Sequence, residues 1–141
     1  PYGITIRVLK YCPQTGACLI YLYRAGWLRS ILSEPSTRAF LAGQGYGADQ
    51  SCQELLRQLS RRLCLEREFP HEIGLFLSYP PEDVKGFIDH RACNFKCAGL
   101  WKVYGDEKKA RELFARFKKC TEIYCALWEA GSGIEQLAVA V

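Results

Sequence analysis

The sequence predicts an α+β protein in which one mixed sheet of about four strands packs against about five helices. Three observations lead to this prediction. Apolar residues alternate with polar ones at Ile4, Ile6 and Val8, which is the period of a half-buried strand. Two later segments, near residues 51–66 and 106–130, repeat their apolar residues at helical spacing. The chain of 141 residues contains no internal repeat or long linker, so we expect residues 1–141 to form a single domain.

The N-terminal third predicts a hairpin followed by two helices. Residues 18–24 (CLIYLYR) form the second strand, and because they are apolar at nearly every position we expect both faces of this strand to be covered. Residues 13–17 (PQTGA) supply the proline and glycine of the connecting turn. Residues 25–33 and 36–43 favour helices, and Pro35 separates them.

A longer helix is predicted in the middle of the chain. Either Asp49 or Ser51 can cap its first turn, since both residue types accept hydrogen bonds from exposed N–H groups. The helix extends to about residue 66, and its inner face is formed by four leucines: Leu55, Leu56, Leu59 and Leu63.

The segment 69–88, FPHEIGLFLSYPPEDVKGFI, predicts a strand that leads into a helix. Residues 73–77 alternate in the manner of a strand. The two prolines at 80–81 suit a helix start, because the N–H groups that they lack have no partner there. The acids at 82–83 favour the same helix through its dipole, so no catalytic role is needed to explain them.

The C-terminal third predicts a fourth strand and the longest helix. Residues 99–104 (GLWKVY) form the strand, and the strand–helix–strand unit 72–104 is long enough for a parallel crossover. Asp106 caps the long helix, which ends near Ala130 at Gly131. Residues 134–141 are expected to form a short helix or strand.

Composition narrows the class of function. The net charge of +4 arises from 19 basic and 15 acidic residues that are well mixed, which does not favour nucleic-acid binding. No apolar run approaches the roughly 20 residues that cross a bilayer, so we expect no membrane partner. The eight cysteines fall below the share typical of disulfide scaffolds, and no signal peptide is present, so a cytoplasmic location is predicted. The absence of an initiator Met suggests a fragment of a longer chain.

One loop has metal-ligand chemistry. His90, Cys93 and Cys97 have the spacing H-x2-C-x3-C, and these three soft ligands could reach one ion. The usual zinc pattern contains two close cysteine pairs, whereas this loop contains one. Unrelated buried or loop thiols are the alternative.

His71 and Glu72 lie side by side near the start of the segment 69–88, and their side chains are candidates for a catalytic role. His71 borders a loop, where an imidazole can serve as a general base or a ligand, or can simply cap backbone groups. We expect Glu72 to form a salt bridge with a nearby arginine, since a carboxylate beside an apolar run needs a partner.

Residues 68–124, including FPHEIGLFLSYPPEDVKGFI and GLWKVYGDEKKARELFARFKKCTEIY, closely resemble DUF3793, a family of domains of unknown function found mainly in anaerobic Firmicutes. Family members usually carry an upstream Cys-Ala-Pro-Thr-Leu-like motif, so the resemblance implies a missing N-terminal family segment. A loose association with flavodoxin-like neighbours implies redox or metal handling, and a flavodoxin-like redox partner, but no defined cofactor. The positions that match the family signature are His71, Glu72, Asp83, Lys85, Gly86, Asn94, Trp101, Lys102, Tyr104 and Gly105.

The leading hypothesis is an accessory module that binds a small anionic or planar ligand. Its pocket is expected where the loop before Ile73, the loop 91–98 and the turn at Gly105 converge. The polar groups expected to orient the ligand are His71, Lys85, Asn94 and Tyr104. One alternative is an enzyme with His71 as acid or base and Cys93 or Cys97 as redox centre or nucleophile. The other is a protein-interaction subunit that docks through the basic helix 106–130.

Overall fold

The computed structural model describes residues 3–138 and is of the α+β class, as predicted. Strands β1 (Thr5–Tyr11) and β2 (Cys18–Tyr23) form an antiparallel N-terminal hairpin. Strands β3 (Cys97–Ala98) and β4 (Lys102–Val103) form a second antiparallel pair. The prediction of one mixed sheet is therefore wrong: the strands of the described residues lie in two separate sheets of two strands each.

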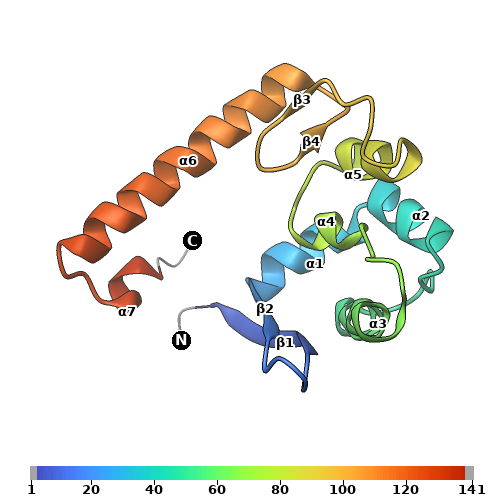
Figure 1. Cartoon of the computed structure of the whole chain (residues 1–141), viewed down its shortest axis with the longest axis horizontal. Coiled ribbons are helices and arrows are strands. Elements are labelled where there is room, and N and C mark those ends of the chain that lie inside the picture. Colours follow the sequence, from blue (N-terminus) through green and yellow to red (C-terminus); the bar gives the residue numbers. More distant parts are fainter. Residues whose placement is uncertain (1–2, 139–141) are drawn as a thin grey trace.

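Helices make up most of the described residues (Figure 1). The helices are α1 (Ala25–Ser33), α2 (Pro35–Gly43), α3 (Cys52–Leu65), α4 (Ile73–Phe76), α5 (Pro81–Asp89), α6 (Glu107–Glu129) and α7 (Ile134–Leu137). The hairpin and α1 to α5 enclose the main core, whereas α6 extends away from this body and the chain then turns back into α7 (Figure 1). The last predicted element reaches residues 139–141, which lie outside the described residues.

The segment Ile73–Phe76 is a short helix, so the prediction of a strand there is wrong. Gly74, Leu75 and Phe76 are consecutive and all buried, whereas an amphipathic strand buries every second residue. A Cβ added at Gly74 would lie 2.8 Å from Cγ2 of Val84, so this glycine lets α4 approach α5 closely. With no strand beside it, the segment satisfies its N–H groups within its own turn. The predicted parallel crossover is consequently absent from the described residues.

The hairpin is covered on one face only, which contradicts the prediction that β2 is covered on both. Leu9, Tyr21 and Tyr23 face the core, and the two tyrosine rings stack with centroids 4.8 Å apart. The hydroxyl of Tyr21 donates to the carbonyl oxygen of Phe76 and so ties the hairpin to α4. The opposite face remains exposed.

The predicted helix starts are confirmed. Ser51 caps α3 in a capping box, with its hydroxyl accepting from the N–H of Glu54 and the Glu54 carboxylate accepting from the N–H of Ser51. Asp106 caps α6 by accepting from the N–H of Lys109 at 3.0 Å. Pro81 occupies the first turn of α5.

Two apolar clusters form the interior. The larger one contains the four predicted leucines of α3 together with residues of the hairpin and of α1, α2, α4 and α5. The smaller one contains Trp101, Val103 and Ala110, and Tyr79 packs against both clusters. In residues 3–138 no helix has the length and apolar character needed to cross a bilayer.

Candidate functional site

A cavity of about 390 Å³ lies between α4, α5 and the segment that carries β3 and β4. Its lining is mainly apolar, with Tyr79, Phe87 and Trp101 as the aromatic members. The polar and ionisable side chains in its lining, besides Tyr79 and Trp101, are His71, Asp83 and Lys102. Of the three parts predicted to converge, the loop before Ile73 contributes His71 to the lining and the loop 91–98 contributes Ala98, whereas the turn at Gly105 does not line the cavity.

Asp83 fixes one wall of the cavity. Its side chain is buried, and its Oδ2 accepts a hydrogen bond from the indole Nε1 of Trp101 at 2.7 Å. Its Oδ1 accepts from the backbone N–H groups of Tyr104 and Gly105 at 2.8 and 2.7 Å. These three donors compensate the cost of burying the carboxylate. Asp83 therefore holds the β4 segment on the first turn of α5 and orients Trp101.

Aromatic packing holds Trp101 rigidly in this wall. Tyr79 stacks on it with ring centroids 4.7 Å apart, and Phe114 from α6 meets it edge-on at 4.5 Å. A Cβ added at Gly99 would lie 2.4 Å from Cε2 of Phe114, so glycine is needed where the β3–β4 turn meets α6. The indole is consequently a preformed surface for a ligand to contact.

A cation and an imidazole stand at the rim of the cavity. Lys102 Nζ donates to the carbonyl oxygen of Ala92 at 2.8 Å and lies 4.6 Å from the ring centroid of Phe95. An ammonium group has three donors, so Lys102 can direct others to a ligand. The exposed ring of His71 packs beside Phe87, with centroids 4.8 Å apart. The arrangement can hold a planar apolar group and an attached anion.

The comparison with family models shows which family the chain belongs to. The model described as "Protein of unknown function (DUF3793)" matches residues 1–138. The chain belongs to this family. Comparisons with curated proteins and with solved structures find no significant match.

The DUF3793 fold brings only one of the four predicted ligand-binding side chains into the lining of the cavity, namely His71. Lys85 is exposed on α5 and forms an ion pair with Asp89 one turn later. Asn94 is exposed in the loop after α5 and adopts a φ of 58° there. The asparagine side chain suits this left-handed backbone, which gives Asn94 a local structural role.

Tyr104, the fourth predicted residue, packs against α5 outside the lining. A Cβ added at Gly86 would lie 2.3 Å from Cγ of Tyr104, so Gly86 is required for this contact. The Tyr104 hydroxyl is buried and has no hydrogen-bond partner within the described part of the chain. Burial raises the pKa of this hydroxyl, and the nearby Cys93 thiol raises it further.

The three predicted metal ligands do not converge in the DUF3793 structure. The ring of His90 stacks on Tyr104, with centroids 5.5 Å apart and planes 5° apart. No set of three His, Cys, Asp or Glu side chains in residues 3–138 is arranged to hold one metal ion. Cys93 and Cys97 also do not line the cavity that His71 borders, so the geometry does not favour the thiol-dependent enzyme.

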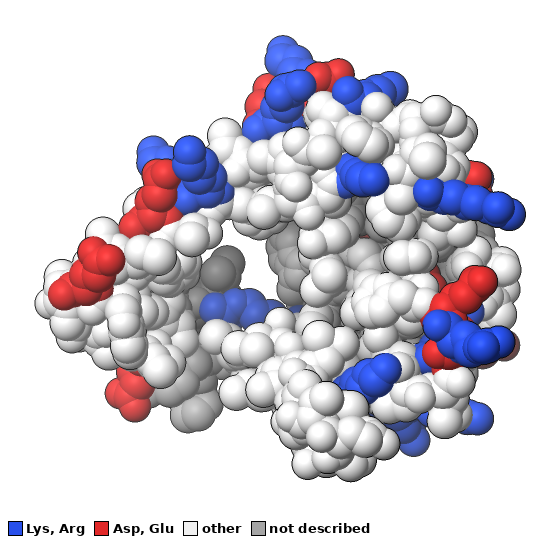
Figure 2. Space-filling view, in the orientation of Figure 1, with Lys and Arg blue, Asp and Glu red and all other residues white. Residues whose placement is uncertain are grey.

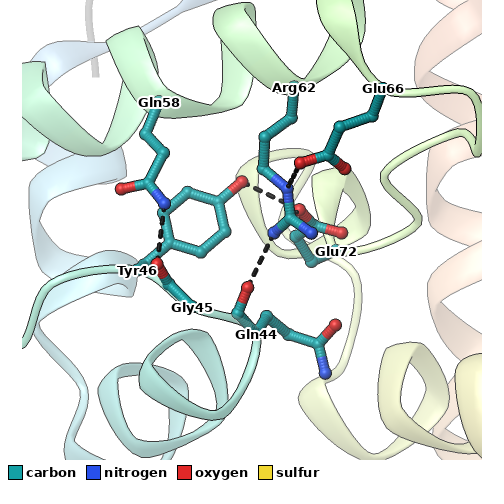
Figure 3. Close-up of polar contacts among 7 residues, drawn as sticks. All are labelled: Gln44, Gly45, Tyr46, Gln58, Arg62, Glu66 and Glu72. Atoms are coloured by element: carbon teal, nitrogen blue, oxygen red, sulfur yellow. Dashed lines mark hydrogen bonds and ion pairs between the residues drawn. The ribbon is translucent and has the colours of Figure 1, made fainter.

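Glu72 forms the predicted salt bridge with an arginine (Figure 3). Its buried carboxylate oxygen Oε1 lies 2.7 Å from Nη1 of Arg62 on α3 and accepts from the Tyr46 hydroxyl at 2.9 Å. Arg62 also pairs with Glu66 at 2.9 Å and donates to the carbonyl oxygen of Gln44 at 2.9 Å. Burial raises the pKa of Tyr46, and the charge of Glu72 raises it further. The network fixes the chain beside His71 and is structural.

Sequence reasoning missed most of the residues that shape the cavity. The available signal was the resemblance to the family, which included Asp83, Trp101 and Lys102 among its matching positions. The residue pattern alone gave Asp83 only a role at the helix dipole and gave the other two no role, because their contacts join positions that are far apart in the sequence, such as Asp83 and Trp101.

Proposed function

We propose that this DUF3793 domain is an accessory module that binds a small planar anion in the cavity between α4, α5 and the β3–β4 segment. The chemical class is an aromatic or heteroaromatic ring that carries a carboxylate or phosphate. The observation that carries the proposal is the preformed aromatic lining with Lys102 at its rim.

The size and chemistry of the cavity support binding. Its volume of about 390 Å³ falls within the range of roughly 300–1,000 Å³ seen for small-molecule sites. Trp101 is already held by Asp83, Tyr79 and Phe114, so little side-chain entropy remains to be lost when a ring packs on it. A charge-assisted hydrogen bond from Lys102 would add selectivity for an anion.

A redox or metal connection is part of the proposal. It is supported by the family resemblance, which associates such domains with flavodoxin-like proteins, and we propose a partner of that class. A cytoplasmic location is proposed as well, and the eight cysteines, all of which are free thiols, support it.

The experiment compares naphthalene-2-carboxylate with naphthalene-2-carboxamide by saturation-transfer NMR. The two probes share a planar ring and differ in charge. We expect the carboxylate to bind at least about tenfold more tightly, because it gains a charge-assisted hydrogen bond of about 1.5–3 kcal/mol. The substitution Lys102→Met should remove this preference while leaving carboxamide binding nearly unchanged.

Lys85→Met is the matched control, since it removes the same charge from exposed surface outside the lining. Equal affinity for both probes, or an equal loss in the two lysine variants, would contradict the proposal.

A further inference from the structure

Within residues 3–138, helix α6 packs on the body of the protein through its first turns, as far as the edge contact of Phe117 with Trp101, and its far part contacts the short helix α7. Ala110 is buried in the small cluster around Trp101, and Leu113 and Phe114 pack against the same cluster. From residue 115 to residue 129 every side chain of α6 is exposed. The far half of the helix stands away from the body, with an opening between it and the hairpin (Figures 1 and 2).

The apolar stripe of α6 continues along this exposed half. Phe117, Tyr124 and Trp128 continue the three- and four-residue spacing of the buried residues, with Thr121 between them, and Ile123 and Leu127 flank this stripe on one side. We call this surface the helix face. Its residues and exposed fractions are Phe117 (46%), Ile123 (49%), Tyr124 (44%), Leu127 (44%) and Trp128 (57%).

A second apolar surface lies on the outer side of the β1–β2 hairpin. Ile6 pairs with Leu22 across the strands, and Val8 pairs with Ile20. An antiparallel sheet that meets solvent on one side normally presents polar residues there, whereas this one presents four aliphatic side chains. We call this surface the hairpin face: Ile6 (68%), Val8 (53%), Ile20 (52%) and Leu22 (59%).

The hairpin and the far part of the helix face belong to segments of opposite charge. Residues 4–24 contain three basic and no acidic residues, which gives a net charge of +3. Residues 120–138, which carry the helix face from Ile123 to Trp128, contain three acidic and no basic residues, which gives −3, whereas Phe117 at the near end of the face is flanked by basic residues. Acidic side chains mark the far end of α6 in Figure 2. The hairpin face and the part of the helix face from Ile123 to Trp128 therefore attract each other as well as sharing apolar character.

We propose that the helix face of one copy packs on the hairpin face of a second copy, twice, around a two-fold axis. A two-fold axis closes the assembly, because each copy supplies one helix face and one hairpin face. Each face exposes on the order of 500 Å² of apolar side chain, if a whole large side chain contributes roughly 200 Å². Two such contacts cover on the order of 2,000 Å² in total, which exceeds the roughly 1,000 Å² that a specific interface requires.

Sedimentation velocity and light scattering of the whole chain test the assembly. We expect a species of twice the 16.0 kDa chain mass at micromolar concentration. Ile6→Lys on the hairpin face and Leu127→Lys on the helix face should each weaken association at least tenfold. Leu65→Lys is the matched control, because Leu65 is 74% exposed at the end of α3, outside both faces. Circular dichroism checks that each variant retains its helix content.

Natural cysteines report which surfaces meet. Cys18 alternates with Ile20 and Leu22 along β2, and Cys120 lies one helical turn before Tyr124; both thiols are exposed. A bismaleimide applied to a mixture of ¹⁵N-labelled and unlabelled protein should link Cys18 to Cys120 in peptides of mixed isotope content. Any of three results would overturn the proposal. The protein could remain a monomer at a concentration on the order of 100 µM, it could form a dimer without this cross-link, or the cross-linked peptides could all carry the same isotope.

Discussion

Replacing Arg62 by methionine isolates the buried carboxylate of Glu72 without changing the size of the side chain greatly. Glu72 would retain the hydroxyl of Tyr46 but lose the guanidinium that lies 2.7 Å from its Oε1. Burial lowers the pKa of Arg62, but the hydrogen bond to Glu66 and the charge of Glu72 outweigh that effect and raise it. The guanidinium is therefore held in its charged form by the groups around it.

The size of the effect follows from burial. Breaking a fully buried ion pair by removal of one partner costs about 3–5 kcal/mol, because an unpaired charge remains. The side chain of Arg62 is 20% exposed and that of Glu72 is 3% exposed, so water can reach the site only from the arginine side. We therefore expect Arg62→Met to lower the free energy of unfolding by about 2–4 kcal/mol.

Urea denaturation followed by circular dichroism measures this loss. Arg57→Met is the matched control, since Arg57 is exposed on the same helix and should change stability by less than about 0.5 kcal/mol. In the double variant Arg62→Met, Glu72→Leu the loss should be smaller than the sum of the single losses, because no charge is left unpaired. Equal effects of Arg62→Met and Arg57→Met, or strict additivity in the double variant, would refute the structural role of the network.

Two further predictions concern close packing and capping. Gly86→Ala should lower the free energy of unfolding by about 1–3 kcal/mol in urea denaturation, because its Cβ would lie 2.3 Å from Cγ of Tyr104. Gly26→Ala is the control, since open space surrounds Gly26, and it should leave the free energy of unfolding unchanged. Equal losses in the two variants would contradict the packing argument. The hydrogen bonds from Ser51 lower the pKa of Glu54, so this cap contributes stability above the unfolded pKa of about 4.3 and loses it as the pH falls through the folded value. NMR titration should show the pKa of Glu54 rising in Ser51→Ala, and an unchanged value would exclude the Ser51 side chain as a cause of the lowered pKa.

Local signals predicted the elements whose structure is decided locally. Ser51 and Asp106 cap helices because the helix N–H groups nearby need acceptors, and Pro81 starts α5 for the corresponding reason. The α4 segment was misassigned because alternation over five residues does not show whether a neighbouring strand exists. β2 was expected to be covered on both faces because its residues are nearly all apolar. Composition does not show whether another part of the chain packs against each face.

The sequence pointed to one residue that lines the cavity but not to most of the others. His71 was found because it borders a loop beside an apolar run, and the structure places it at the cavity. Lys85 was also predicted to bind the ligand, but in the structure it forms an ion pair with Asp89 in the next turn of α5. The role of Asp83 depends on Trp101, which lies 18 residues away in the sequence, and such contacts are set by tertiary packing.

The indole N–H resonance of Trp101 offers the most direct test of the proposed function. Its Nε1 donates to Asp83 within the wall of the cavity, whereas Trp27 and Trp128 are exposed elsewhere. In a ¹H–¹⁵N NMR titration with naphthalene-2-carboxylate, we expect the Trp101 indole signal and the amide signals of α5 and β4 to shift together. The Trp27 and Trp128 signals should remain unchanged. Absence of any shift at millimolar probe, or shifts confined to Trp27 or Trp128, would contradict a planar-anion site in this cavity.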